Sequence, residues 1–65
     1  MNRFIILTDE NGDPLYINWD CITSFGKSEN DDDLSFVRIV HKEDPFDVKE
    51  AAHVIFDKIV AASNA

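Results

Sequence analysis

The feature that most constrains the fold is an Asn11-Gly12 pair between two short apolar runs. Residues 4–8 read Phe-Ile-Ile-Leu-Thr, and residues 15–18 read Leu-Tyr-Ile-Asn. Asn and Gly adopt positive φ angles more readily than other residues, as tight hairpin turns require. The sequence therefore predicts an antiparallel hairpin. Its first strand is expected to have little water on either face, because its apolar residues are consecutive.

Three further strands are expected in the middle of the chain, over residues 22–27, 34–41 and 46–50. Val, Ile and Phe dominate the second of these, and the third alternates apolar and charged residues as a half-exposed strand does. Residues 18–21 are expected to form a tight connection, because Asn and Asp side chains bond to their own backbone in turns. Residues 28–33 are mostly acidic and polar, which is typical of a solvated loop.

The last part of the chain changes to helical periodicity. From residue 52 onward the apolar residues fall within one arc of a helical wheel, and His53, Asp57 and Lys58 lie opposite. The residues of the apolar arc are Ile55, Phe56, Ile59, Val60 and Ala62. An amphipathic helix over residues 52–62 is therefore expected to cover a sheet.

The start of this helix is open to a second interpretation, in which it begins at Pro45 or Asp47. Asp is a good N-cap residue, and Glu50 would complete a capping box with Asp47. With the strand interpretation retained for residues 46–50, the sequence predicts one small α+β domain spanning residues 1–65. It consists of about five short antiparallel strands in a meander, partly barrel-like, with one C-terminal amphipathic helix.

Oligomerisation is the expected source of additional stability. A chain of 65 residues buries only about 60% of the surface that its unfolded form exposes. The single cysteine, Cys21, forms no intrachain disulfide, and no Cys-His cluster offers a structural zinc site. In the fourth strand Phe36 and Val40 point to one face and Val37 and Ile39 point to the other, so both faces are apolar. One short helix shields only one of these faces. The second face is expected to close as a bent, barrel-like sheet or against a second copy, and a homodimer is favoured.

Charge and hydropathy restrict the partners and the location. Thirteen acidic residues against six basic ones give a net charge of −7, which disfavours direct binding to nucleic acid or to a membrane surface. The charge either attracts a protein partner with a basic surface or keeps a small protein in solution. Only four consecutive apolar residues stand near the start, too few for a signal peptide or a membrane span, so a cytoplasmic location is expected.

No pattern in the sequence indicates catalysis, a metal or a cofactor. His41 and His53 lack the i, i+4 partner of helical metal sites, and Cys21 has no nearby cation or histidine in sequence to activate it. The acidic loop lacks the glycine and the terminal glutamate of an EF-hand. The chain is therefore expected not to be an enzyme.

Two groups of residues are candidates for a binding surface. Aromatic residues in and after the second strand are suited to a protein hot spot or to stacking on a planar ligand, and one strand-borne arginine is suited to a phosphate or carboxylate. This first group is Tyr16, Trp19, Phe25 and Arg38. The second group is an acidic surface made of Glu29, Asp31, Asp32, Asp33, Glu43 and Asp44.

Several short motifs link the two ends of the chain to a known family. They are Leu7-Thr8, Asn11-Gly12, Tyr16-Ile17-Asn18, Ile22, the Val-rich strand around residues 36–40, Val48-Lys49-Glu50, and Ile55 with Ile59. In these positions the chain resembles the small FlbD-type proteins associated with flagellar and swarming motility. The resemblance implies a small accessory protein that acts through partners, without catalysis and without a cofactor.

The leading hypothesis is a non-enzymatic cytosolic interaction protein, FlbD-like and homodimeric. Its acidic loops would meet a basic groove on a partner, and the aromatic residues around Trp19 would supply the desolvated centre. Replacement of Trp19 with alanine is then expected to abolish binding and to leave the fold intact.

Two alternatives remain open. The first is an acidic phage-type inhibitor, a DNA mimic or anti-defence protein, which requires the acidic residues to line up on one face. The second is a dimeric sponge for a small nucleotide-like ligand enclosed between Tyr16, Trp19 and Arg38, which requires a pocket at the dimer seam.

Overall fold

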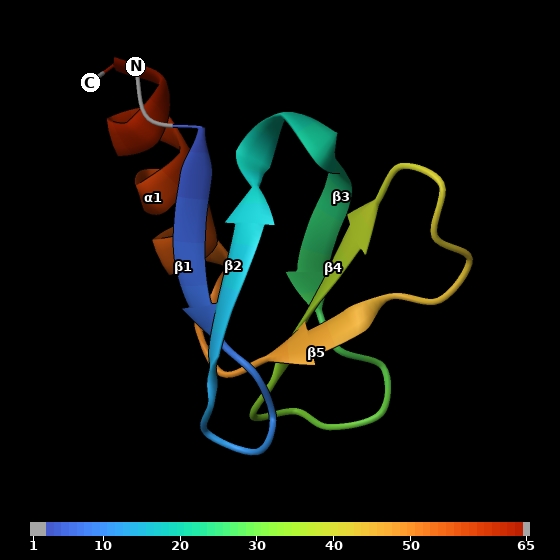
Figure 1. The fold of residues 1–65 in the computed structure, drawn as a ribbon. Helices are drawn as coiled ribbons and strands as arrows, with labels where there is room; N and C mark the ends of the chain where they lie inside the picture. The colour runs from blue at the N-terminus through green and yellow to red at the C-terminus, as the bar shows by residue number, and fades with distance from the viewer. Residues whose placement is uncertain (1–2, 65) are drawn as a thin grey trace.

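The computed structural model describes residues 3–64, and within them the chain forms five strands, one short 3-10 helix and one α-helix (Figure 1). In chain order these are β1 (Phe4–Thr8), β2 (Pro14–Asn18), η1 (Trp19–Cys21), β3 (Ile22–Lys27), β4 (Ser35–Ile39), β5 (Phe46–Val48) and α1 (Ala52–Asn64). The expected α+β class is confirmed. Residues 1, 2 and 65 of the expected domain lie outside the described part.

Strands β1 and β2 form the expected antiparallel hairpin, with Ile6 opposite Tyr16. The turn between them is organised by Asp9, whose carboxylate oxygen Oδ1 accepts the backbone N–H groups of Asn11 and Asp13, both at 2.9 Å. Gly12 has a φ of 91° and donates its N–H to the Asp9 carbonyl at 3.0 Å. The positive φ angle predicted for the Asn11-Gly12 turn is therefore confirmed at Gly12.

Replacing Gly12 with alanine is expected to lower the free energy of unfolding by about 1–2 kcal/mol, because a side chain with a Cβ is strained at this positive φ. Urea denaturation followed by circular dichroism measures this change. Asn11→Ala is the matched control in the same exposed turn, and a Gly12→Ala midpoint equal to that of the wild type would contradict the role given to the turn.

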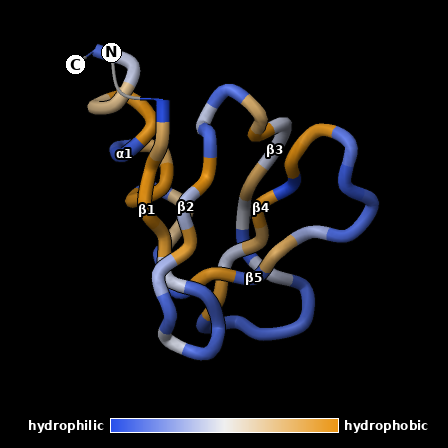
Figure 2. The backbone as a smooth tube through the Cα atoms, in the orientation of Figure 1, coloured by the Kyte–Doolittle hydropathy of each residue, from blue (hydrophilic) through white to orange (hydrophobic). Residues whose placement is uncertain are grey.

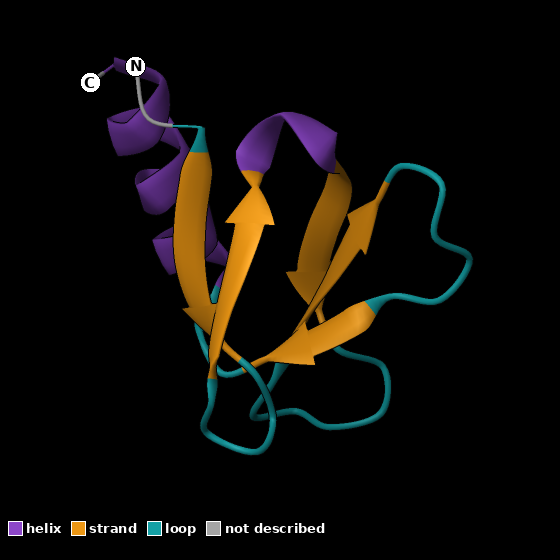
Figure 3. Ribbon diagram, in the orientation of Figure 1, coloured by secondary structure: helices purple, strands orange, loops and turns teal. Residues whose placement is uncertain are grey.

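The five strands divide into two sheets, which corrects the expectation of one partly barrel-like meander. The hairpin β1-β2 is one sheet, and β3-β4-β5 is the other, with all pairs antiparallel (Figure 3). An isolated bridge between Asp9 and Val48, and a hydrogen bond of 2.9 Å from Lys49 N–H to the Thr8 carbonyl, join the two. The sheets do not close into a barrel, because η1 separates β2 from β3.

The connection through η1 follows from Asn18. Its side-chain oxygen accepts the N–H of Asp20 at 3.0 Å and so caps the 3-10 turn. This is the local side-chain bond expected for residues 18–21. The expected tight connection is confirmed, and it turns the chain out of the hairpin plane before β3 begins.

The boundaries of the later elements settle the two interpretations of residues 46–50. These residues form a strand only as far as Val48, and α1 begins at Ala52, so a helix starting at Pro45 or Asp47 is wrong. The fourth strand is also shorter than residues 34–41, because Val40 and His41 already turn and His41 has a φ of 68°. Within residues 3–64, no helix is both long and apolar enough to span a membrane.

The core lies between the two sheets and is covered by α1, which packs against β1 and β3 (Figures 1 and 2). Both sheets and the helix contribute buried side chains: Ile5, Leu7, Ile17, Val37, Val48, Ile55 and Ala62. The two long loops of the second sheet are hydrophilic, as Figure 2 shows. One copy of the chain therefore encloses a continuous core.

The two expectations about strand faces have different outcomes, and the one for β1 is wrong. In β1, Ile5 and Leu7 point into the core, but Phe4 and Ile6 lie on the outer face and are about half exposed, so this strand is not shielded on both faces. In β4 the expected alternation is confirmed: Val37 and Ile39 face the core, and the half-buried Phe36 shares the outer face with the exposed Arg38.

Candidate functional site

A shallow apolar hollow lies between η1, the start of β3 and the middle of α1. Its volume is about 350 Å³, and its lining residues are Trp19, Asp20, Ile22, Thr23, Phe25, Phe56 and Ile59. We refer to it as the aromatic groove. Three of these seven side chains are aromatic and two are isoleucines, so a ligand in the groove would be held mainly by apolar contacts.

Some side chains that line the aromatic groove pack against the core, and one of them is largely exposed to solvent. Trp19, Phe25 and Ile59 are partly buried and pack against the buried cluster. Phe56 is 57% exposed. The Phe56 ring therefore leaves the groove open to solvent on the side of α1.

Trp19 has two roles in this arrangement. It lines the aromatic groove, and it also contacts the core from the end of the hairpin, where its backbone N–H donates to the Arg3 carbonyl at 3.1 Å. Replacing it with alanine therefore removes packing as well as groove surface. Phe56 is the better residue for a test of binding, because its side chain is largely outside the core.

The structure brings together two of the four residues predicted as a binding surface. Trp19 and Phe25 share the aromatic groove. Tyr16 lies on the outer face of the hairpin and is 65% exposed. Arg38 is exposed on β4, donates to the Glu43 carbonyl at 3.4 Å, and lines a different hollow of about 210 Å³. A single ligand held by Tyr16, Trp19 and Arg38 of one copy is therefore excluded by their placement.

Sequence reasoning missed Phe56 and Ile59 as groove residues, because both belong to the apolar arc that was assigned to the sheet. A signal was present in the width of that arc. Ile55, Ile59 and Ala62 lie close together on the helical wheel, whereas Phe56 and Val60 lie toward one edge of the arc, one helical step of about 100° from Ile55 and Ile59. Only Ile55 and Ala62 of this arc are buried.

The predicted acidic surface is divided between two loops. Glu29 to Asp33 lie in the loop between β3 and β4, whereas Glu43 and Asp44 lie in the loop between β4 and β5, at the opposite end of β4 (Figure 1). Asp32 pairs with Lys27 at 3.7 Å, and Arg38 stands on the strand between the loops. The alignment on one face that a DNA mimic requires is therefore not met by these six residues.

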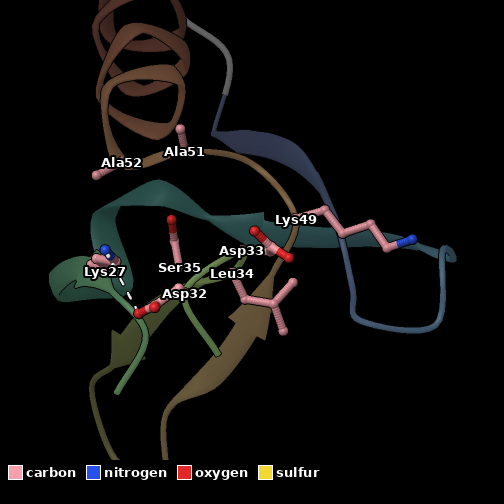
Figure 4. Close-up of a pocket in the computed structure, with 8 residues that line it drawn as sticks. All are labelled: Lys27, Asp32, Asp33, Leu34, Ser35, Lys49, Ala51 and Ala52. Atoms are coloured by element: carbon pink, nitrogen blue, oxygen red, sulfur yellow. Dashed lines mark ion pairs between the residues drawn. The ribbon is translucent and has the colours of Figure 1, made fainter. Parts of the chain in front are cut away.

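A third hollow, of about 250 Å³, lies beside the start of α1 (Figure 4). Its lining residues are Lys27, Asp32, Asp33, Leu34, Ser35, Lys49, Ala51 and Ala52. Lys27 pairs with Asp32 at 3.7 Å, and the Lys49 side chain points away from the other lining groups, as Figure 4 shows. One lysine and two aspartates therefore remain around the hollow, which gives its lining a small negative charge.

No group of three or more potential metal ligands lies together within residues 3–64. His41 and His53 are exposed, on the β4–β5 loop and on α1 respectively. Cys21 is half-buried at the end of η1, and its backbone carbonyl accepts the Val40 N–H at 2.8 Å. This bond places Cys21 beside the residue that precedes His41, but within residues 3–64 these side chains do not form a group of metal ligands.

Some of the residues that carry the family resemblance, those of the Leu7-Thr8 and Val48-Lys49-Glu50 motifs, meet in space at the junction of the two sheets. Leu7 and Val48 are fully buried, and Glu50 accepts two hydrogen bonds from Thr8, one from its N–H at 2.8 Å and one from its hydroxyl at 2.9 Å. Comparison with protein-family models, with curated proteins and with solved structures finds no match to this chain. Membership of the FlbD-type family stays a prediction, and the motif residues are explained here by the fold.

Proposed function

We propose that this protein is a non-enzymatic, cytosolic accessory protein that binds a segment of a partner protein in the aromatic groove. The observation that supports this function is the exposed Phe56 ring beside the half-buried Trp19 and Phe25. The mechanism is occupancy: a large apolar side chain of the partner fills the groove and desolvates the three rings.

The charge of the chain indicates the chemistry of the partner segment. The net charge is −7, Asp20 lies in the groove lining, and the exposed Asp57 follows Phe56 on the helix. A segment with Lys or Arg beside its apolar anchor gains from this field, whereas an acidic segment is repelled. We therefore expect an amphipathic partner segment with one or two large apolar residues and basic neighbours.

Phe56→Ser is expected to weaken partner binding about tenfold or more, because it removes the exposed wall of the groove and leaves the core contacts in place. Tagged wild-type protein and variants are used to isolate partners from the host of the gene, and the affinity for the purified partner is then measured by calorimetry. Raising the salt concentration is expected to weaken the wild-type complex, because the partner is basic.

Val60→Ser is the matched control for this experiment. Val60 stands four residues after Phe56 on α1, is 39% exposed, and does not line the groove. It is expected to retain wild-type affinity, and thermal unfolding of each variant checks that the fold is intact. A partner that binds the Phe56→Ser variant as tightly as the wild type would contradict the proposed function.

A further inference from the structure

The outer face of the β1–β2 hairpin carries adjoining apolar side chains that α1 and the second sheet leave exposed. Cross-strand pairing places Ile6 directly opposite Tyr16 and Phe4 opposite Asn18 on this face. Phe4 is 53% exposed, Ile6 50% and Tyr16 65%. Exposed apolar side chains that adjoin one another on a small monomer mark an interaction surface.

This face is also free of charge along its centre, in a chain in which 29% of the residues are charged. Phe4, Ile6, Tyr16 and Asn18 are all neutral, and so is Pro14 at the turn end. The carboxylate that reaches its edge, that of Glu50, is hydrogen-bonded to Thr8. The hairpin face is thus the part of an acidic molecule on which two copies approach without placing like charges opposite each other.

We propose that the hairpin face is the interface of a homodimer, in which two hairpins pack face to face about a twofold axis. A basic partner would gain nothing from a neutral face, because its charges would remain unpaired there. A second copy of this acidic chain, in contrast, meets like charges when it approaches the acidic loops but not when it approaches this face. The charge pattern therefore selects a second copy as the occupant. This interface is separate from the aromatic groove, whose lining residues belong to η1, β3 and α1.

The exposed area fits a reversible dimer. Aromatic side chains have surfaces of about 150–250 Å² each, so the exposed parts of Phe4, Ile6 and Tyr16 present roughly 300 Å² of apolar surface per copy. A standard interface buries about 800 Å² per partner, of which the apolar centre is only a part. The patch is large enough for such a centre, with Pro14 and Asn18 as a neutral rim, and we expect a dissociation constant in the micromolar range.

The charges at the two ends of the hairpin favour an antiparallel arrangement of the copies. Exposed Arg3 precedes β1 at one end. The exposed Glu10 and Asp13 lie in the turn at the other end, which stays acidic although the Lys49 ammonium comes near Gly12 there. When the hairpins stack antiparallel, Arg3 of each copy comes over the acidic turn of the partner. In a parallel stack the two acidic turns would repel each other. Because of the twofold symmetry, the contact between Arg3 and the acidic turn occurs twice in the dimer.

Analytical ultracentrifugation between 1 and 500 μM protein tests this interface. We expect a concentration-dependent dimer for the wild type, and a dissociation constant raised about 30-fold or more by the double substitution Ile6→Thr/Tyr16→Thr. Threonine keeps strand propensity at both exposed positions, so the hairpin is expected to fold. Val40→Thr, at an apolar position 43% exposed outside the hairpin, and Phe56→Ser are expected to leave the dimer unchanged.

A charge exchange makes the test independent of folding. Arg3→Glu is expected to weaken the dimer, and Arg3→Glu/Glu10→Arg is expected to restore it, because an unfolded variant is not rescued by a second exposed charge. A wild-type protein that stays monomeric throughout the concentration range overturns the proposal. So does a dimer whose dissociation constant is unchanged by Ile6→Thr/Tyr16→Thr, or a dimer that is dissociated by Phe56→Ser and by no other variant. Failure of the exchange to restore the dimer overturns the antiparallel arrangement.

Discussion

Ile55→Ala is expected to lower the free energy of unfolding by about 3–4 kcal/mol. Ile55 is fully buried and is the side chain of α1 that lies deepest in the core shared by both sheets. Removing three carbon atoms there loses their transfer free energy and leaves a cavity that the rigid surroundings fill only in part. A chain of this size has roughly 3–10 kcal/mol of stability in total, so the variant is expected to be partly unfolded at 37 °C.

Urea denaturation monitored by Trp19 fluorescence and by circular dichroism measures this loss. Phe56→Ala is the matched control, since Phe56 is the next residue of the same helix but is 57% exposed, and its cost is expected to stay below about 1 kcal/mol. Measurements are made at protein concentrations well below the expected dissociation constant of the dimer, so that only the monomer is observed. Equal losses for both variants would contradict the placement of the helix on the core.

The order and kind of the elements were predictable from local patterns. The apolar runs around the Asn11-Gly12 turn predicted the hairpin, and the change of period near residue 52 predicted α1. Both signals are local, because a turn residue with positive φ and a helical stripe act within a few positions of the chain. Boundaries were less accurate: the fourth strand ends two residues early, where His41 turns the chain.

The division into two sheets was not predictable in the same way. It depends on whether β2 and β3 pair after the turn at residues 18–21, and the strand patterns alone are compatible with either outcome. In the structure η1 turns β3 away from the hairpin, and Val48 bridges to Asp9 instead. Which strand edges meet is decided by tertiary packing of the core, not by the periodicity of any one strand.

Only part of the candidate site was predictable from the sequence, because tertiary packing also decides which side chains share the aromatic groove. Trp19 and Phe25 were singled out by residue type, but Phe56 joins them only because α1 crosses β3. The same packing places Tyr16, which is close to Trp19 in sequence, and Arg38, which is not, on two further surfaces. Residue type identified aromatics suited to binding, and the helix position decided which of them form one groove.

Glu50→Ala is expected to lower the free energy of unfolding by about 2–3 kcal/mol. Its carboxylate accepts hydrogen bonds from the Thr8 N–H at 2.8 Å and the Thr8 hydroxyl at 2.9 Å, between partly buried residues 42 positions apart. Bonds to a charged acceptor are stronger than neutral ones, and the alanine variant leaves the donors of Thr8 without this partner. The pair also holds the segment before α1 against the end of β1, so its loss loosens the junction of the two sheets.

A double-mutant cycle with Thr8→Val isolates this contribution, because valine keeps the shape of threonine and removes only the hydroxyl. We expect a coupling energy of about 1 kcal/mol between the two positions in urea denaturation. Glu50→Gln keeps an acceptor for the N–H and is expected to cost less than alanine. Glu43→Ala, in an exposed loop, is the control for loss of one negative charge and is expected to change stability by less than about 0.5 kcal/mol. A Glu50→Ala variant as stable as the Glu43→Ala variant would show that the Thr8–Glu50 contact does not hold the sheets together, and the motif residues at this junction would then need an explanation other than the fold.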